Sequence, residues 1–387
     1  MKIRMYECGF GDCFRLREEN QVDLYVDFGI HTSSWSGIDK INRFDNIIAD
    51  MGKDTDFLLT HYHDDHFNGA IYMATHTTHK FRDVYIPDVW GMPESIYITS
   101  LILLRGIITR SVILGHNTII DFLKSICNNE SRIHFISRGT TFHNNQYIAL
   151  WPEKEYVAQK AQSMFEKIQN NLNNEDKKIL NHIEKMAKQL NEIVDIMTKQ
   201  LNEIIDIMAT ADNYFDKCII KFNDLEKNYR KVYNQVQYIF DKQNENRYNK
   251  NLQYKLTKFG NEISIVFQNY QAERNVLFTG DFGKKRNWLF IENNQDNRVN
   301  MHSNYEVIKL PHHGTNSYYH SFTGRIQNTS TLMIPNGYIN HNWYVSQKYN
   351  IDSVHIGNRV ICAHNTKCLG PICSKCMCIY PHLYFDI

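Results

Sequence analysis

The stretch Leu59-Thr60-His61-Tyr62-His63-Asp64-Asp65-His66-Phe67 decides how the rest of the chain is interpreted. Residues 57–60 are apolar enough to end a buried strand, and three histidines and two aspartates follow within six positions. Neutral imidazole and carboxylate groups are ligands for Zn²⁺, Mn²⁺ or Fe²⁺, and a turn directly after a strand can bring several of them to one point. A solvated polar turn is the alternative interpretation. The density of ligands favours a metal site.

Length and composition set the broad class. A chain of 387 residues is long enough for one large domain or two ordinary ones. Its 43 basic and 42 acidic residues give a net charge of +1, so composition predicts no global field for polyanions, although a local basic groove remains compatible with it. No apolar run is long enough to span a bilayer and the first residues lack the core of a signal peptide. We therefore expect a soluble cytoplasmic protein that makes no membrane contact.

Other segments repeat the pattern of an apolar strand that runs into polar residues. Residues 24–26 lead into Asp27-Phe28-Gly29, and residues 275–278 lead into Thr279-Gly280-Asp281. Residues 307–310 lead into Pro311-His312-His313-Gly314-Thr315. The segment Cys8-Gly9-Phe10-Gly11-Asp12 predicts a flexible corner between two strands that together span residues 3–28. A strand is also expected over residues 260–267, and helices are expected over residues 38–50 and from residue 68.

These motifs together resemble the metallo-β-lactamase-fold hydrolases, whose signature is Thr-His-x-His-x-Asp-His. The Gly-x-Gly-Asp, Asp-x-Gly, Thr-Gly-Asp and His-His-Gly-Ser/Thr elements are similar to the subgroup related to the nuclease-like domain of the competence protein ComEC. The resemblance covers residues 1–152 and 257–360. It implies an α+β fold, an αββα sandwich of two mixed sheets with helices outside.

The resemblance also implies a ligand set for two metal ions, Zn²⁺ or Mn²⁺. The first motif supplies ligands to both ions, Asp281 bridges them, and one histidine of the His-His-Gly turn binds a metal while the other orients the substrate. We favour His313 as that ligand. His341 would complete the second site, although His-Asn replaces the usual His-Pro there and His355 and His364 are substitutes. The implied metal ligands are His61, His63, Asp65, His66, Asp281, His313 and His341.

A hydroxide held between the two metals would be the nucleophile, which implies a metal-dependent hydrolase, most simply a phosphodiesterase or nuclease acting on a nucleic acid or nucleotide. In that chemistry Asp65 orients the hydroxide, and His312 or His313 stabilises the developing negative charge. Asp27 would brace the metal turn. Tyr318 and Tyr319 are candidates for stacking on a base or for simple packing. The alternatives are a hydrolase of small esters, thioesters or phosphorylated metabolites, and a scaffold without catalysis.

Residues 153–256 differ in character from both flanking segments. They contain neither glycine nor proline, and the segment Lys188–Met197 returns as Lys199–Met208 after eleven residues. Eleven residues span three helical turns almost without drift, so the repeat predicts one apolar stripe on a long helix. We interpret the segment as a coiled-coil-like helical hairpin inserted into the hydrolase-like part. It is a candidate surface for self-association or for a protein partner.

The tail, residues 361–387, holds five of the nine cysteines. Cys373 and Cys376 have the two-residue spacing of a zinc knuckle. Free buried thiols are the alternative. The candidate ligands of a structural Zn²⁺ are Cys362, His364, Cys368, Cys373, Cys376 and Cys378. Between the first motif and Asp281, the histidines His116, His134 and His143 are weak further candidates, and we interpret His143 as a loop residue.

Overall fold

The computed structural model divides the chain into two units. The first, here called the sheet unit, contains Met1–Pro87, Ile136–Pro152 and Asn261–Ile387, and the second, the helical unit, contains Asp88–Phe135 and Glu153–Gly260. The residues that the structure describes are 1–19, 21–31, 37–90, 92–109, 118–128, 130–203, 212–242, 247–270, 274–283, 285–293, 299–335, 346, 348–349, 359–362 and 383–386.

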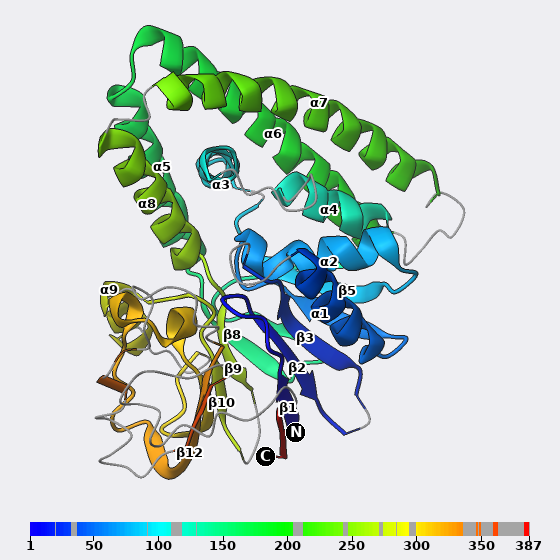
Figure 1. Cartoon of the computed structure of the whole chain (residues 1–387), viewed down its shortest axis with the longest axis vertical. Helices are drawn as coiled ribbons and strands as arrows, with labels where there is room; N and C mark the ends of the chain where they lie inside the picture. Colours follow the sequence, from blue (N-terminus) through cyan, green and yellow to red (C-terminus); the bar gives the residue numbers. More distant parts are fainter. Residues whose placement is uncertain are drawn as a thin grey trace. The chain divides into compact units, whose positions relative to one another are not determined.

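The first sheet combines an antiparallel part with a parallel part (Figure 1). Neighbouring strands run antiparallel from β14 to β3, whereas β3, β4 and β5 run parallel. Within the described residues its order is β14 (Leu383–Asp386), β1 (Lys2–Met5), β2 (Cys13–Arg17), β3 (Asp23–Phe28), β4 (Thr55–Leu58), β5 (Phe81–Pro87) and β6 (Arg132–Ile136).

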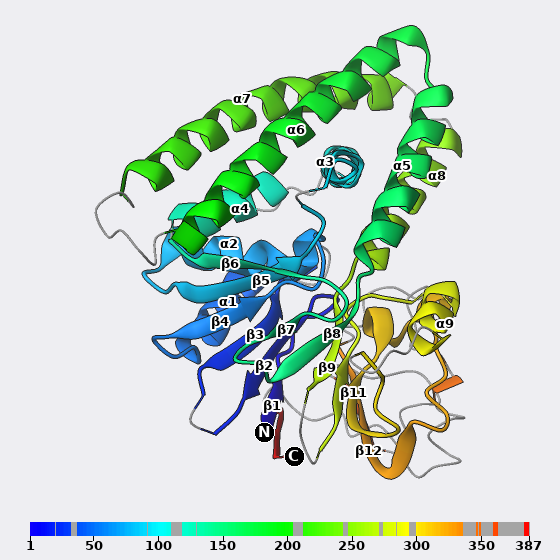
Figure 2. The ribbon, with the colours of Figure 1, turned by 180° about the vertical axis from the view of Figure 1, so that it is seen from behind.

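The second sheet is mixed in the same way (Figure 2). Its strands β13 to β10 are parallel, and β10 to β7 are antiparallel. The order among described residues is β13 (Arg359–Cys362), β12 (Ile326–Ile334), β11 (Tyr305–Lys309), β10 (Val276–Phe278), β9 (Val266–Asn269), β8 (Tyr147–Trp151) and β7 (Thr141–Phe142). The fold is therefore mixed α and β with two mixed sheets, in agreement with the coarse part of the prediction.

The core of the sheet unit lies between these two sheets. One cluster of buried side chains draws members from strands of both, including Leu16 and Val26 from the first sheet and Val276 from the second. The rings of Phe14 and Phe278 meet edge to face across the core with centroids 5.4 Å apart. Burial of this shared apolar surface holds the sheets face to face.

Helices α1 (Gly37–Ala49) and α2 (Asp64–His76) lie against the first sheet, and α9 (Lys285–Asn293) lies beside the second (Figure 1). The approach of α2 is close, because a Cβ added at Gly69 would stand 2.6 Å from the ring of Phe28. Glycine at this position thus lets the helix approach β3. Because only residues 59–63 separate β4 from α2, this packing also sets the position of the histidines and aspartates of residues 61–66.

Three local predictions are wrong. Residues 3–28 form three strands, β1 to β3, and not two. The helix after the motif starts at Asp64, four residues earlier than expected, and its first turn contains Asp64 and Asp65, whose charges favour a helix N-terminus. The strand expected from residue 260 starts only at Val266, because helix α8 (Arg247–Glu262) continues into that segment.

The helical unit contains α3 (Ser95–Ile108), α4 (Ile119–Asn128), α5 (Lys154–Asn170), α6 (Asn174–Glu203), α7 (Asp212–Lys242) and most of α8. Helices α6 and α7 run side by side, and α3 packs on α6 and α5 (Figures 1 and 2). The unit thus includes residues 88–135 as well as the segment predicted as an insertion. No helix in the described part of the chain is long and apolar enough to cross a bilayer.

The eleven-residue repeat starts in α6. Its first copy buries Leu190, Ile193, Val194 and Met197, as the apolar stripe predicts. The second copy continues past the end of α6 at Glu203, and its side chains lie outside the described residues.

Candidate metal centre

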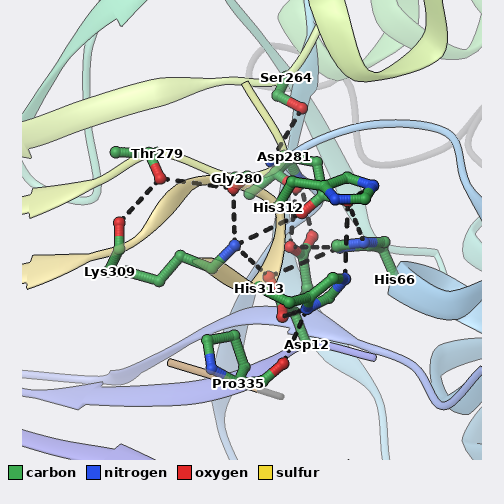
Figure 3. Close-up of polar contacts among 12 residues, drawn as sticks. Asp12, His66, Ser264, Thr279, Gly280, Asp281, Lys309, His312, His313 and Pro335 are labelled. Atoms are coloured by element: carbon green, nitrogen blue, oxygen red, sulfur yellow. Dashed lines mark hydrogen bonds and ion pairs between the residues drawn. The ribbon is translucent and has the colours of Figure 1, made fainter. Parts of the chain in front are cut away.

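Turns at the carboxyl ends of three strands meet at one point of the sheet unit. β4 is followed by His61 and His63, β10 by Asp281, and β11 by the histidine pair of the 3₁₀ turn Pro311–Gly314. His61, His66, His313 and Asp281 are all at most 2% exposed. Figure 3 shows His66, His312 and His313 gathered around Asp281. Buried polar side chains at this density need partners or an ion.

Two groups of three residues could each hold a metal ion. His61, His63 and Asp281 form one group, and Asp65, His66 and His313 form the other, with ligand atoms within 4.8 Å of one another in each. Six of the seven metal ligands named from the sequence therefore come together. The seventh, His341, lies outside the described residues.

One carboxylate oxygen is the centre of the cluster. The Oδ2 atom of Asp281 lies 3.5 Å from Nε2 of His66, 3.7 Å from that of His313, 3.8 Å from that of His312 and 3.9 Å from that of His61. The backbone N–H of Asp281 donates to the Oγ of Ser264 at 3.2 Å, which fixes the turn that carries the aspartate. Four imidazoles from two segments, residues 61–66 and the turn Pro311–Gly314, thus face one oxygen of a third turn.

A hydrogen-bond chain determines which nitrogen of His66 and His61 faces the cluster. Asp27 Oδ2 accepts from Nδ1 of His66 at 2.8 Å and from the hydroxyl of Thr60 at 2.7 Å. Since that hydroxyl gives its only proton to Asp27, its oxygen accepts from Nδ1 of His61 at 3.0 Å. In the neutral imidazole, both histidines would therefore carry the lone pair on Nε2, which is the form that binds a metal.

The same logic applies to the histidine pair of the second motif. The hydroxyl of Thr315 donates to the carbonyl of His312 at 2.9 Å, so its oxygen accepts from Nδ1 of His312 at 2.8 Å. Nδ1 of His313 donates to the carbonyl of Pro335 at 2.8 Å and lies 3.3 Å from Asp12 Oδ1. Both rings thus turn Nε2 to the cluster. The sequence had left open which of these two histidines is the ligand.

The backbone of this second turn is strained. His312 and His313 have φ of 43° and 56°, in the left-handed region that non-glycine residues rarely adopt, and Gly314 follows with φ of 72°. Left-handed backbone at two adjacent histidines costs free energy that the rest of the turn must offset. Such strain is typical of functional turns, and here it aims both rings at Asp281.

Opposite charges set the ionisation of the metal-free cluster. Burial disfavours the imidazolium of His66, yet Asp27 and Asp281 raise its pKa well above the usual value. Burial likewise opposes ionisation of Asp281, but His313 and His66 hold its pKa well below the usual range. His312 differs, because burial lowers its pKa to about 4 and keeps it neutral near pH 7.

Sequence reasoning missed Lys309, the last residue of β11. Its side chain is 1% exposed, and Nζ lies 2.6 Å from Asp12 Oδ2 and 3.5 Å from Asp281 Oδ1 (Figure 3). Burial would lower the pKa of this lysine, but the two carboxylates raise it. A charged residue at the end of an apolar strand, directly before the Pro-His-His turn, was the signal that could have identified it.

Other expectations have varied outcomes. Tyr318 stacks on the ring of His312, with centroids 3.9 Å apart, and accepts a hydrogen bond from Asn261 at 2.9 Å. Tyr319 packs against Tyr349. Both contacts favour the packing interpretation. His143 does lie in a turn, but it is buried, with its Nδ1 2.9 Å from Asp56 Oδ2.

Most of the cysteine tail lies outside the described residues. The backbone of Cys362 ends β13, while its side chain and the residues His364, Cys368, Cys373, Cys376 and Cys378 lie outside what the structure describes. The structural zinc therefore stays a prediction. No known protein-family model and no curated protein matches this chain, so the centre rests on its own geometry.

Proposed function

We propose that the protein is a dinuclear metal-dependent phosphodiesterase with the metallo-β-lactamase fold. The observation that carries the proposal is the convergence of four histidine Nε2 atoms on one oxygen of Asp281, each within 3.9 Å. A buried cluster of imidazole nitrogens and carboxylate oxygens matches the ligands of Zn²⁺ or Mn²⁺. The motifs that supply it occur in the order in which the family has them.

The residues fit two cations. The Nε2 atom of His66 is fully buried and makes no hydrogen bond to any described residue, which suits a nitrogen that faces an ion. His61 and His63 would hold one cation, Asp65, His66 and His313 the other, and Asp281 would lie between them. When bound, two such ions would lower the pKa of a water molecule and polarise a phosphoryl oxygen.

The chain's own groups supply the remaining functions. Asp65 is partly exposed, whereas Asp12, Asp27 and Asp281 are almost fully buried. Asp65 is therefore the carboxylate that attacking water can reach, and it would orient that water and accept its proton. His312 keeps 18% of its side chain exposed, so it lies at the substrate side of the cluster.

The assay that tests the proposal compares two model substrates. Protein loaded with Zn²⁺ or Mn²⁺ should cleave bis-p-nitrophenyl phosphate, and Asp65→Ala and Asp281→Ala should both abolish that cleavage. Cleavage of p-nitrophenyl acetate alone would move the substrate to the ester and thioester class. Two bound metals with no cleavage of either compound would favour a scaffold. Single- and double-stranded DNA and RNA then define the physiological class.

A further inference from the structure

Lys309 is a buried ammonium group inside a candidate metal centre. Its Nζ lies 2.6 Å from Asp12 Oδ2, 2.6 Å from the carbonyl oxygen of Gly280 and 3.5 Å from Asp281 Oδ1. Two of these contacts, at 2.6 Å, are close, while Asp281 Oδ1 forms an ion pair with the ammonium at the longer distance of 3.5 Å. The group is therefore held in one place and acts on Asp12 and Asp281 together.

The contacts of Lys309 distinguish the two oxygens of Asp281. Oδ1 faces the ammonium, while Oδ2 faces the four imidazoles. Attraction between the ammonium and Oδ1 opposes a rotation of the carboxylate that would exchange the two oxygens. The hydrogen bond to the carbonyl of Gly280 also holds the lysine against the turn that carries Asp281.

Lys309 also affects Asp12. Besides the two groups assigned above, two further sets of residues could hold an ion, and Asp12 belongs to both, once with Asp27 and His66 and once with Asp281 and His313. The ammonium already neutralises Asp12 at 2.6 Å. Electrostatics therefore disfavours a divalent ion at Asp12, whose Oδ1 instead lies 3.3 Å from Nδ1 of His313.

We propose that Lys309 is a positioning residue, a built-in cation that fixes the carboxylate of Asp281 with Oδ2 towards the histidines and keeps Asp12 from binding metal. This inference rests on the proposed dinuclear centre. In this inference, the role of Asp12 is to orient the ring of His313. Residues that orient a ligand typically contribute about 10- to 100-fold to metal affinity.

The test uses Co²⁺ as the metal, because its visible absorption bands report the coordination of the ion. A buried Asp12 left without its lysine would unfold the protein more readily, so the comparison is between Asp12→Asn and the double variant Asp12→Asn/Lys309→Met. The double variant should bind Co²⁺ about 10- to 100-fold more weakly than Asp12→Asn, with altered bands. Lys40→Met, which changes a buried lysine of α1, is the matched control and should keep the wild-type spectrum.

Equal affinity and identical bands in Asp12→Asn and in the double variant would overturn the inference. A second double variant, Asp12→Asn/Lys309→Gln, retains an N–H donor beside Asp281 and should recover part of the affinity. No recovery would indicate only a packing role for the lysine and would also overturn the inference. Wild-type protein that binds no Co²⁺ would instead refute the proposed function, so the two failures are distinguishable.

Discussion

Replacement of Asp27 by asparagine should reverse the tautomer of His66 and weaken metal binding. The carboxylate accepts three hydrogen bonds from two residues. Its Oδ1 accepts from the backbone N–H of Thr60 at 2.7 Å, and its Oδ2 accepts from the Thr60 hydroxyl at 2.7 Å and from Nδ1 of His66 at 2.8 Å. Asparagine has nearly the same shape but only one oxygen.

The magnitude follows from where that oxygen points. If it stays on the backbone N–H of Thr60, the amide NH₂ faces two donors, and His66 avoids the clash by moving its proton to Nε2, which faces Asp281. If the oxygen instead faces the Thr60 hydroxyl and His66, the buried backbone N–H of Thr60 loses its acceptor, at a cost of about 1–3 kcal/mol. In the first case the ligand lone pair is lost, and we expect affinity to fall about 10- to 100-fold, or about 1.4–2.7 kcal/mol.

Competition with a chromophoric chelator measures this affinity, and urea denaturation measures stability. The matched control is Asp56→Asn, because Asp56 also accepts from a histidine Nδ1, that of His143 at 2.9 Å, and pairs with Arg82 at 3.0 Å. It lies near the start of β4, whereas the metal motif follows the end of that strand. The control should lose stability and keep metal affinity. Wild-type affinity in Asp27→Asn, or an equal loss in both variants, would refute the reasoning.

Three further predictions concern charge, packing and the helical unit. Burial opposes ionisation of Asp12, but Lys309 holds the pKa of its carboxyl group at about 2. The ionised carboxylate therefore stabilises the fold fully above about pH 4, and this contribution is lost as the pH falls towards 2. Acid denaturation of the metal-free protein should accordingly be shallower in Asp12→Asn. A Cβ at Gly283 would stand 2.4 Å from the ring of Tyr318, so Gly283→Ala should displace that ring and lower kcat on the phosphodiester, and an unchanged kcat would contradict the role of the stack. Leu190→Ala in α6 should cost about 2–5 kcal/mol in urea denaturation and leave metal affinity unchanged.

The sequence predicted the ligands better than it predicted the elements around them. The ligands of the first motif are neighbours in the chain, and a strand followed by a turn brings them together by local geometry alone. Asp281 lies more than 200 residues further on, and only the resemblance of its Thr-Gly-Asp turn to a family motif indicated it. The structure places its Oδ2 atom 3.9 Å from Nε2 of His61.

Element boundaries were less predictable because local propensity and tertiary packing compete. The segment from residue 260 alternates like a strand, yet helix α8 extends to Glu262 and the strand begins at Val266. The start of α2 at Asp64 was hidden because the first turn of this helix consists of the polar motif itself. In both places, the position of the element boundary depends on residues that are distant in sequence.

The sequence alone determined the chemical types in the centre, namely the histidines and aspartates that end apolar strands, since a motif specifies which groups are present. It also determined the apolar stripe of the long helix, because a period of eleven residues fixes a helical face. Only the tertiary structure decided which nitrogen of each histidine faces Asp281 and that Lys309 lies between two carboxylates. Several of these contacts, such as those of Asp27 with His66 and of Lys309 with Asp12, join segments that are distant in the sequence, and such contacts leave no periodic trace in the chain.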